Sequence, residues 1–217
     1  MTPEIIELSD QSLFERMKQC TESCGLIVYP TDTSYGLGAN ALDDSSVLRV
    51  YDAKGRDRNK PLSIVVSKRT LAVFGQYNSK IDLIDQFLPG PLTIILYQNG
   101  QLSQNLNLNE PKKVAFRVLP SEFRISQFID SYHIPLTATS ANLSSSPENT
   151  LNRIIRDLPL LKTDLVIRAE LPMSFVPSTV VDLTCTPPKI LREGLLSREL
   201  REAGCLSYSY SITKKNL

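Results

Sequence analysis

Two short motifs, far apart in the chain, carry residue types that hold phosphate. The first is Lys54-Gly55-Arg56, in which an ammonium and a planar guanidinium stand two positions apart, and both groups commonly bind phosphate oxygens. The second is Ser140-Ala141-Asn142, which adds neutral hydrogen-bond donors and acceptors. Such pieces suit a nucleotide. They do not resemble a metal cluster or a nucleophile with its base.

The first motif opens a basic run, residues 54–60, in which every second residue is basic: Lys54, Arg56, Arg58 and Lys60. A run of this kind is either a solvated basic loop or a clamp for polyphosphate. The residues alone leave both interpretations open.

A stretch rich in hydroxyls and glycines, residues 31–38, follows the first predicted strand. Its donors and acceptors could meet a small polar ligand, or they could simply form a turn. The spacing matches neither a Walker loop nor the dinucleotide-binding fingerprint.

Two arginines stand directly after apolar residues. Arg117 lies near the end of the predicted strand 114–118, and Arg192 lies in the segment 190–194. A guanidinium there can bind a ligand's carboxylate bidentately, or it can pair with a neighbouring Asp or Glu. Both alternatives apply to each arginine.

Capping residues and apolar periodicity predict the elements that must position these side chains. Helices are expected at residues 10–24, with Asp10 as cap and Gly25 as stop, and at 43–51, capped by Asp43 or Asp44. Further helices are expected at 81–88, 122–132 and 150–158, with a short one after 198. Strands are expected at 26–29, 61–66, 92–97, 114–118, 134–139, 165–168, 179–183 and 189–192. Residues 98–112 form a predicted exposed loop and a candidate lid.

Helices and strands interleave, but several connections are too short for a helical crossover. The sequence therefore predicts an α/β fold with a twisted sheet of mixed parallel and antiparallel strands, flanked by helices. At 217 residues and 41% hydrophobic, one domain over residues 1–206 with a polar tail at 207–217 is expected.

Charge and cysteine content exclude several classes of protein. Lys and Arg number 24 against 23 Asp and Glu, so a general nucleic-acid or membrane binder is not expected. Residues 1–7 carry acids where a secretory signal needs basic residues, and no stretch approaches the ~20 apolar residues of a membrane span. We expect a cytoplasmic protein. The four cysteines form no CxxC pair, and Cys20 and Cys24 would share a helix face as ordinary thiols.

Seven segments, in this order, resemble the YrdC family, the threonylcarbamoyl-adenylate synthases of tRNA modification. The resemblance covers residues 25–194, and the segments are 29–37, 54–62, 88–93, 116–118, 139–144, 178–182 and 191–194. It implies a YrdC-like single domain with a concave basic cleft.

The resemblance also implies the reaction. Members of the family condense L-threonine, bicarbonate or CO2, and ATP into threonylcarbamoyl-AMP and release pyrophosphate, which makes them nucleotidyltransferases. This is the first step of N6-threonylcarbamoyladenosine formation at position 37 of tRNAs that read ANN codons. A downstream transferase complex then moves the group to the tRNA.

Residue by residue, the resemblance assigns two binding sets. The ATP set is Lys54, Arg56, Lys60, Ser140, Asn142 and Arg192, and the L-threonine set is Thr33, Arg117, Ala138 and Ser178. Lys54 and Arg56 are expected to stabilise charge in the transition state, without a covalent nucleophile. Mg²⁺ is expected to accompany ATP without protein ligands.

The chain departs from the family pattern at four places. Lys60 stands where many relatives have Asn, Val65 where some have a threonine-contacting His, and Leu88 where Trp is common. Ser145 replaces a Gly and would be strained at a positive φ. A non-catalytic RNA-binding module of the same fold, with weak RNA binding by the basic loop, is the alternative function. The carbamoyl-adenylating domain of hydrogenase maturation proteins is a third, but their zinc motifs are absent from this sequence.

Overall fold

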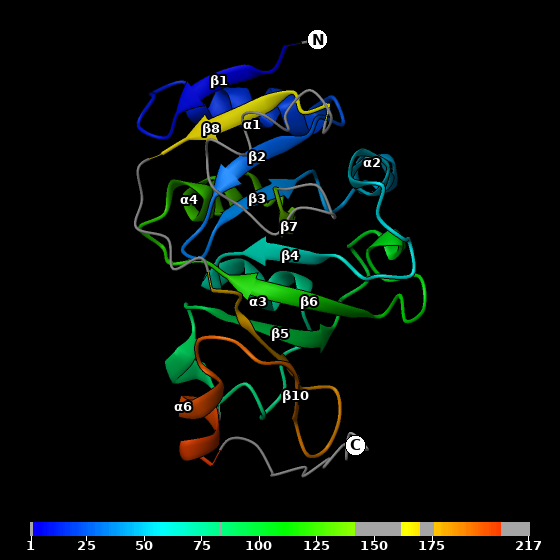
Figure 1. The fold of residues 1–217 in the computed structure, drawn as a ribbon, viewed down its shortest axis with the longest axis vertical. Coiled ribbons are helices and arrows are strands. Elements are labelled where there is room, and N and C mark those ends of the chain that lie inside the picture. The colour runs from blue at the N-terminus through cyan, green and yellow to red at the C-terminus, as the bar shows by residue number, and fades with distance from the viewer. Residues whose placement is uncertain (1, 83, 142–161, 170–175, 205–217) are drawn as a thin grey trace, which may run out of the picture.

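The computed structural model describes residues 2–82, 84–141, 162–169 and 176–204. Within these ranges ten strands form one sheet in the order β1-β8-β2-β3-β7-β4-β6-β5-β9-β10 (Figure 1). The strands are β1 (Glu4–Glu7), β2 (Ile27–Pro30), β3 (Tyr35–Gly38), β4 (Ser63–Val66), β5 (Leu92–Tyr97), β6 (Lys113–Val118), β7 (Leu136–Ser140), β8 (Leu165–Arg168), β9 (Thr179–Asp182) and β10 (Lys189–Arg192). The sheet contains both parallel pairs, such as β4 with β6 and β5 with β9, and antiparallel pairs, such as β5 with β6. The predicted mixed α/β sheet is confirmed.

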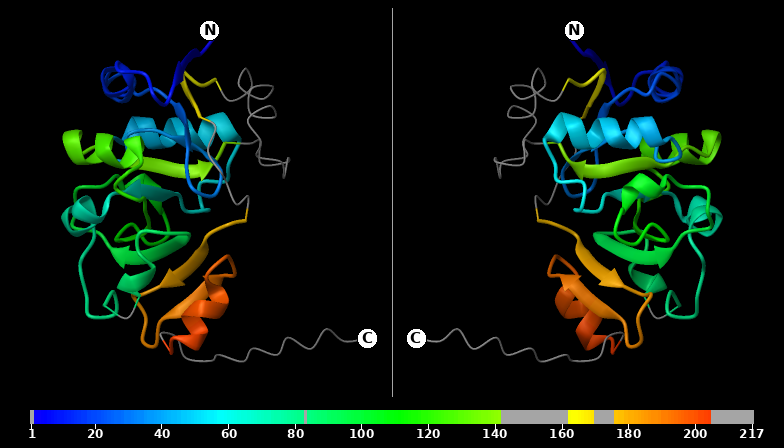
Figure 2. Two further views of the ribbon diagram at one scale, coloured as in Figure 1. Left: turned by 90° about the vertical axis from the view of Figure 1, so that its left-hand side faces the viewer. Right: turned by 90° about the vertical axis from the view of Figure 1, so that its right-hand side faces the viewer.

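Helices cover both faces of this sheet. They are α1 (Leu13–Glu22), α2 (Asp44–Lys54), α3 (Lys68–Phe74), α4 (Arg124–Tyr132) and α6 (Ser197–Glu202). Because side chains alternate along a strand, Ile64 and Val66 of β4 join the core that α2 and α3 cover. Val65 joins the second core, with apolar residues of α1 and α4. Figure 2 shows α1 and α6 at opposite ends of the molecule.

Helix α2 positions the basic motif much as its sequence predicts. Asp43 is its N-cap and accepts a hydrogen bond from the backbone N–H of Ser46 at 2.6 Å. Gly55 ends the helix in the left-handed conformation, at φ +55°, which glycine adopts without a Cβ penalty. Lys54 is therefore the last helical residue, and Arg56 begins the connection to β4.

The predicted ends of the first helix are wrong. The helix begins after Ser12, whose N–H and hydroxyl donate to the carboxylate of Asp10, so Asp10 holds the preceding turn and does not cap the helix. At the other end Cys24, and not Gly25, takes the positive φ of 56°. Cys24 thus lies beyond the helix and does not share a helix face with Cys20.

Three elements were not predicted: β1, β3 and α3. The helix expected at residues 81–88 is reduced to a 3-10 turn, Asp85–Phe87.

The loop over residues 98–112 is anchored, contrary to expectation. It contains a 3-10 turn, Gln104–Leu106, and buries Leu102 and Leu106 in the core. Its carbonyl at Leu106 accepts from the N–H of Leu62 at 2.8 Å. Since none of its residues lines the pocket described below, the structure does not support a lid at this loop.

Several predictions fall outside the described residues: Asn142, Ser145, the helix at 150–158 and the tail at 207–217. The domain limits 1–206 stay a prediction. Of the helices that the structure does describe, none combines the length and apolar composition of a membrane span.

Candidate functional site

One pocket of about 700 Å³ opens on the Val65 face of the sheet. Alternate residues of four neighbouring strands contribute to its wall: Ser63 and Val65 of β4, Ala115 and Arg117 of β6, Thr93 and Ile95 of β5, and Val180 of β9 with Ser178 just before it. In the strand register Val65 lies opposite Arg117, Arg117 opposite Thr93, and Thr93 opposite Val180. These four residues thus form one row across the sheet. A pocket of this size is in the range of small-molecule sites.

Arg117 is the most buried charge of the pocket. Its side chain is 7% exposed, and its Nη2 lies 2.5 Å from Oδ1 of Asp32. Burial lowers the pKa of Arg117, and the charge of Asp32 opposes that shift. Within the described residues its Nε has no hydrogen-bond partner. A buried N–H of this kind is costly unless it finds an acceptor. Arg117 lines the pocket, so its guanidinium is placed to bind an anionic ligand there.

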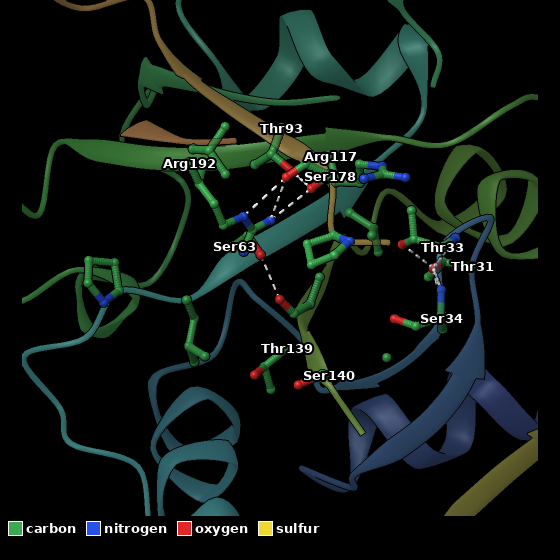
Figure 3. Close-up of a pocket in the computed structure, with 18 of the residues that line it drawn as sticks. Thr31, Thr33, Ser34, Ser63, Thr93, Arg117, Thr139, Ser140, Ser178 and Arg192 are labelled. Atoms are coloured by element: carbon green, nitrogen blue, oxygen red, sulfur yellow. Dashed lines mark hydrogen bonds between the residues drawn. The ribbon is translucent and has the colours of Figure 1, made fainter. Parts of the chain in front are cut away.

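Arg192 and Ser178 are joined by several hydrogen bonds (Figure 3). Nη2 of Arg192 donates to the hydroxyl and to the carbonyl of Ser178, both at 3.0 Å, and Nε donates to that carbonyl at 3.1 Å. Thr93 Oγ1 lies 2.8 Å from Ser178 Oγ. Burial, and then the charge of Arg117, lower the pKa of Arg192. The two guanidinium groups therefore give this side of the pocket a positive field.

The basic motif meets β7 at the other side of the pocket. Arg56 lines the pocket, and its guanidinium donates to the carbonyls of Lys60 and Pro61. Lys54 is buried, and its ammonium donates to the carbonyl of Ser140 and to Thr139 Oγ1. Burial, with a smaller effect of the Arg56 charge, lowers the pKa of Lys54 to about 8. Lys54 thus holds the wall that presents Thr139 and Ser140, while the side chain of Lys60 is exposed and does not line the pocket.

The connection between β2 and β3 supplies hydroxyls. Thr31 accepts from the backbone N–H groups of Thr33 and Ser34 and lies 3.3 Å from the hydroxyl of Thr33. All three line the pocket. Residues 31–34 therefore form a turn and also part of the pocket wall. Residues 35–38 form strand β3, whereas the sequence had indicated only a turn or a ligand-binding segment there.

The structure brings most predicted site residues together. Thr33, Arg56, Arg117, Ala138, Ser140, Ser178 and Arg192 line the same pocket. Ion pairing and ligand binding were alternatives for Arg117, and the structure shows the ion pair at the pocket wall.

Two pocket residues, Ser63 and Thr93, were not predicted. Ser63 Oγ donates to the carbonyl of Ala138 at 2.6 Å and so ties β4 to β7. Both are hydroxyl residues in otherwise apolar strands that face the same side as Arg117. That alternation was an available signal for both, and Thr93 also ends the segment 88–93 that carries the family resemblance.

The sequence model of the Sua5/YciO/YrdC family, described as telomere recombination, matches residues 20–194. The chain belongs to this family. A Pyrococcus abyssi protein named threonylcarbamoyl-AMP synthase is 35% identical over 177 residues, which cover 80% of this chain and 52% of that protein. The chain thus spans about half the length of that relative. A Methanocaldococcus jannaschii protein that carries the same name provisionally is 33% identical over 195 residues, 89% of this chain and 91% of its own.

Solved structures of the Sua5/YciO/YrdC family share the fold. The structure of P. abyssi Sua5 complexed with L-threonine superposes with a TM-score of 0.82 at 28% identity. The match covers 100% of this chain and 65% of the Sua5 chain. E. coli YciO gives a TM-score of 0.75 at 23% identity, with 88% of this chain and 94% of its own covered. At that identity the second likeness shows the fold alone.

Proposed function

We propose that this protein makes L-threonylcarbamoyladenylate from L-threonine, bicarbonate or CO2, and ATP, with release of pyrophosphate. The observation that carries the proposal is that one pocket is lined both by the buried guanidinium of Arg117 and by Arg56 of the basic motif. The relatives named threonylcarbamoyl-AMP synthase and the threonine complex of P. abyssi Sua5 support it.

Threonine would occupy the side of the pocket near Arg117. Its carboxylate would bind the guanidinium, where a charge-assisted bond in a buried site is strong. The hydroxyls of Thr33 and Ser178 would form hydrogen bonds with the ammonium or hydroxyl group of threonine. The backbone at Ala138 would form the wall on this side of the pocket. Val65 leaves the middle of this wall apolar.

ATP would occupy the side near Arg56 and Ser140. Arg56, which lines this side, would neutralise the phosphates directly. Lys54 does not line the pocket and would add its charge from its place against Thr139 and Ser140. Lys60 and Asn142, assigned to ATP by resemblance, are proposed as further contacts. Arg192 was assigned to ATP by resemblance, yet it bonds to Ser178. We propose that it lies where the two substrates meet.

The chemistry needs no enzyme nucleophile. Bicarbonate condenses with the threonine amine to a carbamate, with loss of water. A carbamate oxygen then attacks the α-phosphorus of ATP, the bond from that phosphorus to the bridging oxygen breaks, and pyrophosphate leaves with the electron pair. The protein contributes by alignment, which can supply roughly 7–11 kcal/mol, and by cations beside the charge that develops.

Mg²⁺ would arrive with ATP. The pocket lining that the structure describes contains no Asp or Glu side chain, so it does not fit a dedicated Mg²⁺ site made by the protein. Phosphate oxygens and water are the ligands that this ion accepts readily.

Pyrophosphate release by the purified protein tests the proposal. We expect release to require ATP, threonine and bicarbonate together, and the adenylate to be detected by mass spectrometry. Equal release when threonine is omitted would contradict the proposal.

Transfer of the product to tRNA by a downstream transferase complex, and action in the cytoplasm, are parts of the same proposal. RNA binding without catalysis stays a prediction, and it is based on the basic loop at residues 54–60. It predicts RNA binding that weakens steeply as salt rises, with no threonine-dependent pyrophosphate release.

A further inference from the structure

Thr93 lies at the centre of the pocket wall, next to Arg117 and Ser178, two residues assigned to binding the substrate L-threonine. It lies opposite Arg117 in the register of β5 and β6, and its hydroxyl is 2.8 Å from that of Ser178. Its side chain is buried, with the residue 5% exposed. Thr93 ends the segment 88–93 that carries the family resemblance, but no role was assigned to its side chain.

The hydroxyl of Ser178 has a limited set of bonds. It offers one proton and two acceptor sites. Arg192 takes one acceptor site, because a guanidinium only donates. Thr93 takes either the proton or the second acceptor site, since either hydroxyl can be the donor. If Thr93 takes the proton, an acceptor site of Ser178 is left for the ligand. If Thr93 takes the second acceptor site, the proton of Ser178 is left for the ligand.

The two directions of the Thr93–Ser178 bond suit two forms of the substrate. When Ser178 donates to Thr93, it keeps a lone pair for a donor, such as the threonine ammonium. When Thr93 donates to Ser178, the proton of Ser178 is free for an acceptor, such as an oxygen of the carbamate. Rotation of two hydroxyl protons interconverts these states and moves no heavy atom.

We propose that Thr93 is a positioning residue that sets the hydrogen-bond direction of Ser178, so that one hydroxyl serves first the amine and then the carbamate of threonine. The proposal rests on the proposed function. Thr93 acts through Ser178 and does not touch the reacting atoms.

The test compares Thr93→Val, which keeps the shape and removes the hydroxyl, with Thr93→Ser, which keeps the hydroxyl. Thr179→Val is the matched control, because Thr179 is a buried threonine of the neighbouring strand whose hydroxyl bonds to the backbone N–H of Leu196 and lies near Ser197. Thr179 does not line the pocket. Circular dichroism and thermal unfolding establish that each variant folds, and Thr93→Ala replaces Thr93→Val if the latter does not.

We expect Thr93→Val to raise the KM for threonine about five- to tenfold and to lower kcat by a similar factor, the size of one lost hydrogen bond at each stage. The KM for ATP should stay within about twofold of wild type, and Thr93→Ser should restore both constants. Thr179→Val should change the melting temperature without raising the KM for threonine.

An unchanged KM for threonine in Thr93→Val, or a Thr93→Ser variant as impaired as Thr93→Val, would overturn the role of the hydroxyl. A raised KM with an unchanged kcat would overturn the two-stage role. Failure of the proposed function looks different, because the wild-type protein itself would then release no pyrophosphate in response to threonine.

Discussion

Arg117 and Asp32 form an ion pair at the pocket wall, although one lies on β6 and the other in the turn between β2 and β3. The pair links the side of the pocket that carries the buried guanidinium to the side that carries Thr33. Asp32 offsets the cost of burying Arg117, since its charge favours the protonated guanidinium. Arg117 also lines the pocket, so Asp32 holds the guanidinium in place where it can still bind an anion.

Asp32→Asn should make the protein depend on threonine for stability. Loss of the carboxylate leaves the charge of Arg117 poorly compensated, and we expect the ligand-free protein to lose about 1–3 kcal/mol of unfolding free energy. Saturating threonine should then raise the melting temperature of the variant more than that of wild type, because its carboxylate supplies the missing charge. Thermal unfolding with and without threonine measures both effects.

The control is Asp52→Asn, which breaks the exposed ion pair between Asp52 and Arg58. An exposed pair contributes about 0.2–1 kcal/mol, and this one lies away from the pocket lining. A threonine response equal to wild type in Asp32→Asn would refute the role of Asp32.

Arg56→Ala should lower kcat/KM for ATP by about 100-fold, because the proposed function places this cation beside the phosphates of ATP, where charge develops as the adenylyl group is transferred. Arg58→Ala is the matched control: it removes the same charge two residues away in the same loop, from a side chain that does not line the pocket. Steady-state pyrophosphate release separates the two variants. Equal losses would mean that the loop acts only through its net charge.

Affinity for ATP should fall at alkaline pH. The pKa of Lys54 is about 8, lowered by burial and by Arg56, so the ammonium loses its proton as the pH rises through about 8. Below this pH the dissociation constant of ATP should be nearly constant, and above it the constant should rise by up to about tenfold per pH unit. Titration calorimetry between about pH 6.5 and about pH 9.5 measures the profile, because this range extends to both sides of the pKa of Lys54.

Lys54→Arg is the control for this pH profile, because a guanidinium stays protonated throughout that range. Its ATP affinity should show no inflection near pH 8. An inflection that persists in Lys54→Arg would assign the titration to another group.

Gly38→Ala should destabilise the fold. A Cβ at Gly38 would lie 2.6 Å from the carbonyl of Thr137 and 2.6 Å from the ring of Tyr29, and both are fixed in the sheet. Overpacking of this kind costs about 1–3 kcal/mol. Urea unfolding should show a lower midpoint with an unchanged slope, whereas a midpoint equal to wild type would show that the sheet adjusts freely.

The sequence predicts this fold best where patterns are local. Strand β5 was predicted at Leu92–Tyr97 and observed there, because an apolar run rich in β-branched residues follows Pro-Gly-Pro. Strand β3 was missed because Tyr35–Gly38 has two glycines, a composition typical of turns. At Gly38 the reason for glycine is the ring of Tyr29 on the paired strand, a contact that no local pattern reveals.

The site shows the same limit. Arg117 was identified as a pocket residue or an ion-pair partner, but its partner could not be chosen among the acidic residues. Asp32 becomes that partner only through the pairing of β3 with β7, β7 with β4 and β4 with β6. Thr93 was overlooked because its place beside Arg117 depends on the register of β5 and β6, which the sequence does not specify.

The order of the strands has a consequence for the protein during its synthesis. β9 and β10 are the last strands along the chain that the structure describes, yet β9 pairs with β5 and β10 with β9. Ser178, just before β9, and Arg192 of β10 line the pocket. A nascent chain that has released β1 to β7 from the ribosome holds Thr33, Arg56 and Arg117 but cannot yet close the wall that contains Ser178. Under the proposed function, threonine would therefore protect a chain that contains β9 and β10 from proteolysis and would leave fragments that end before these strands exposed.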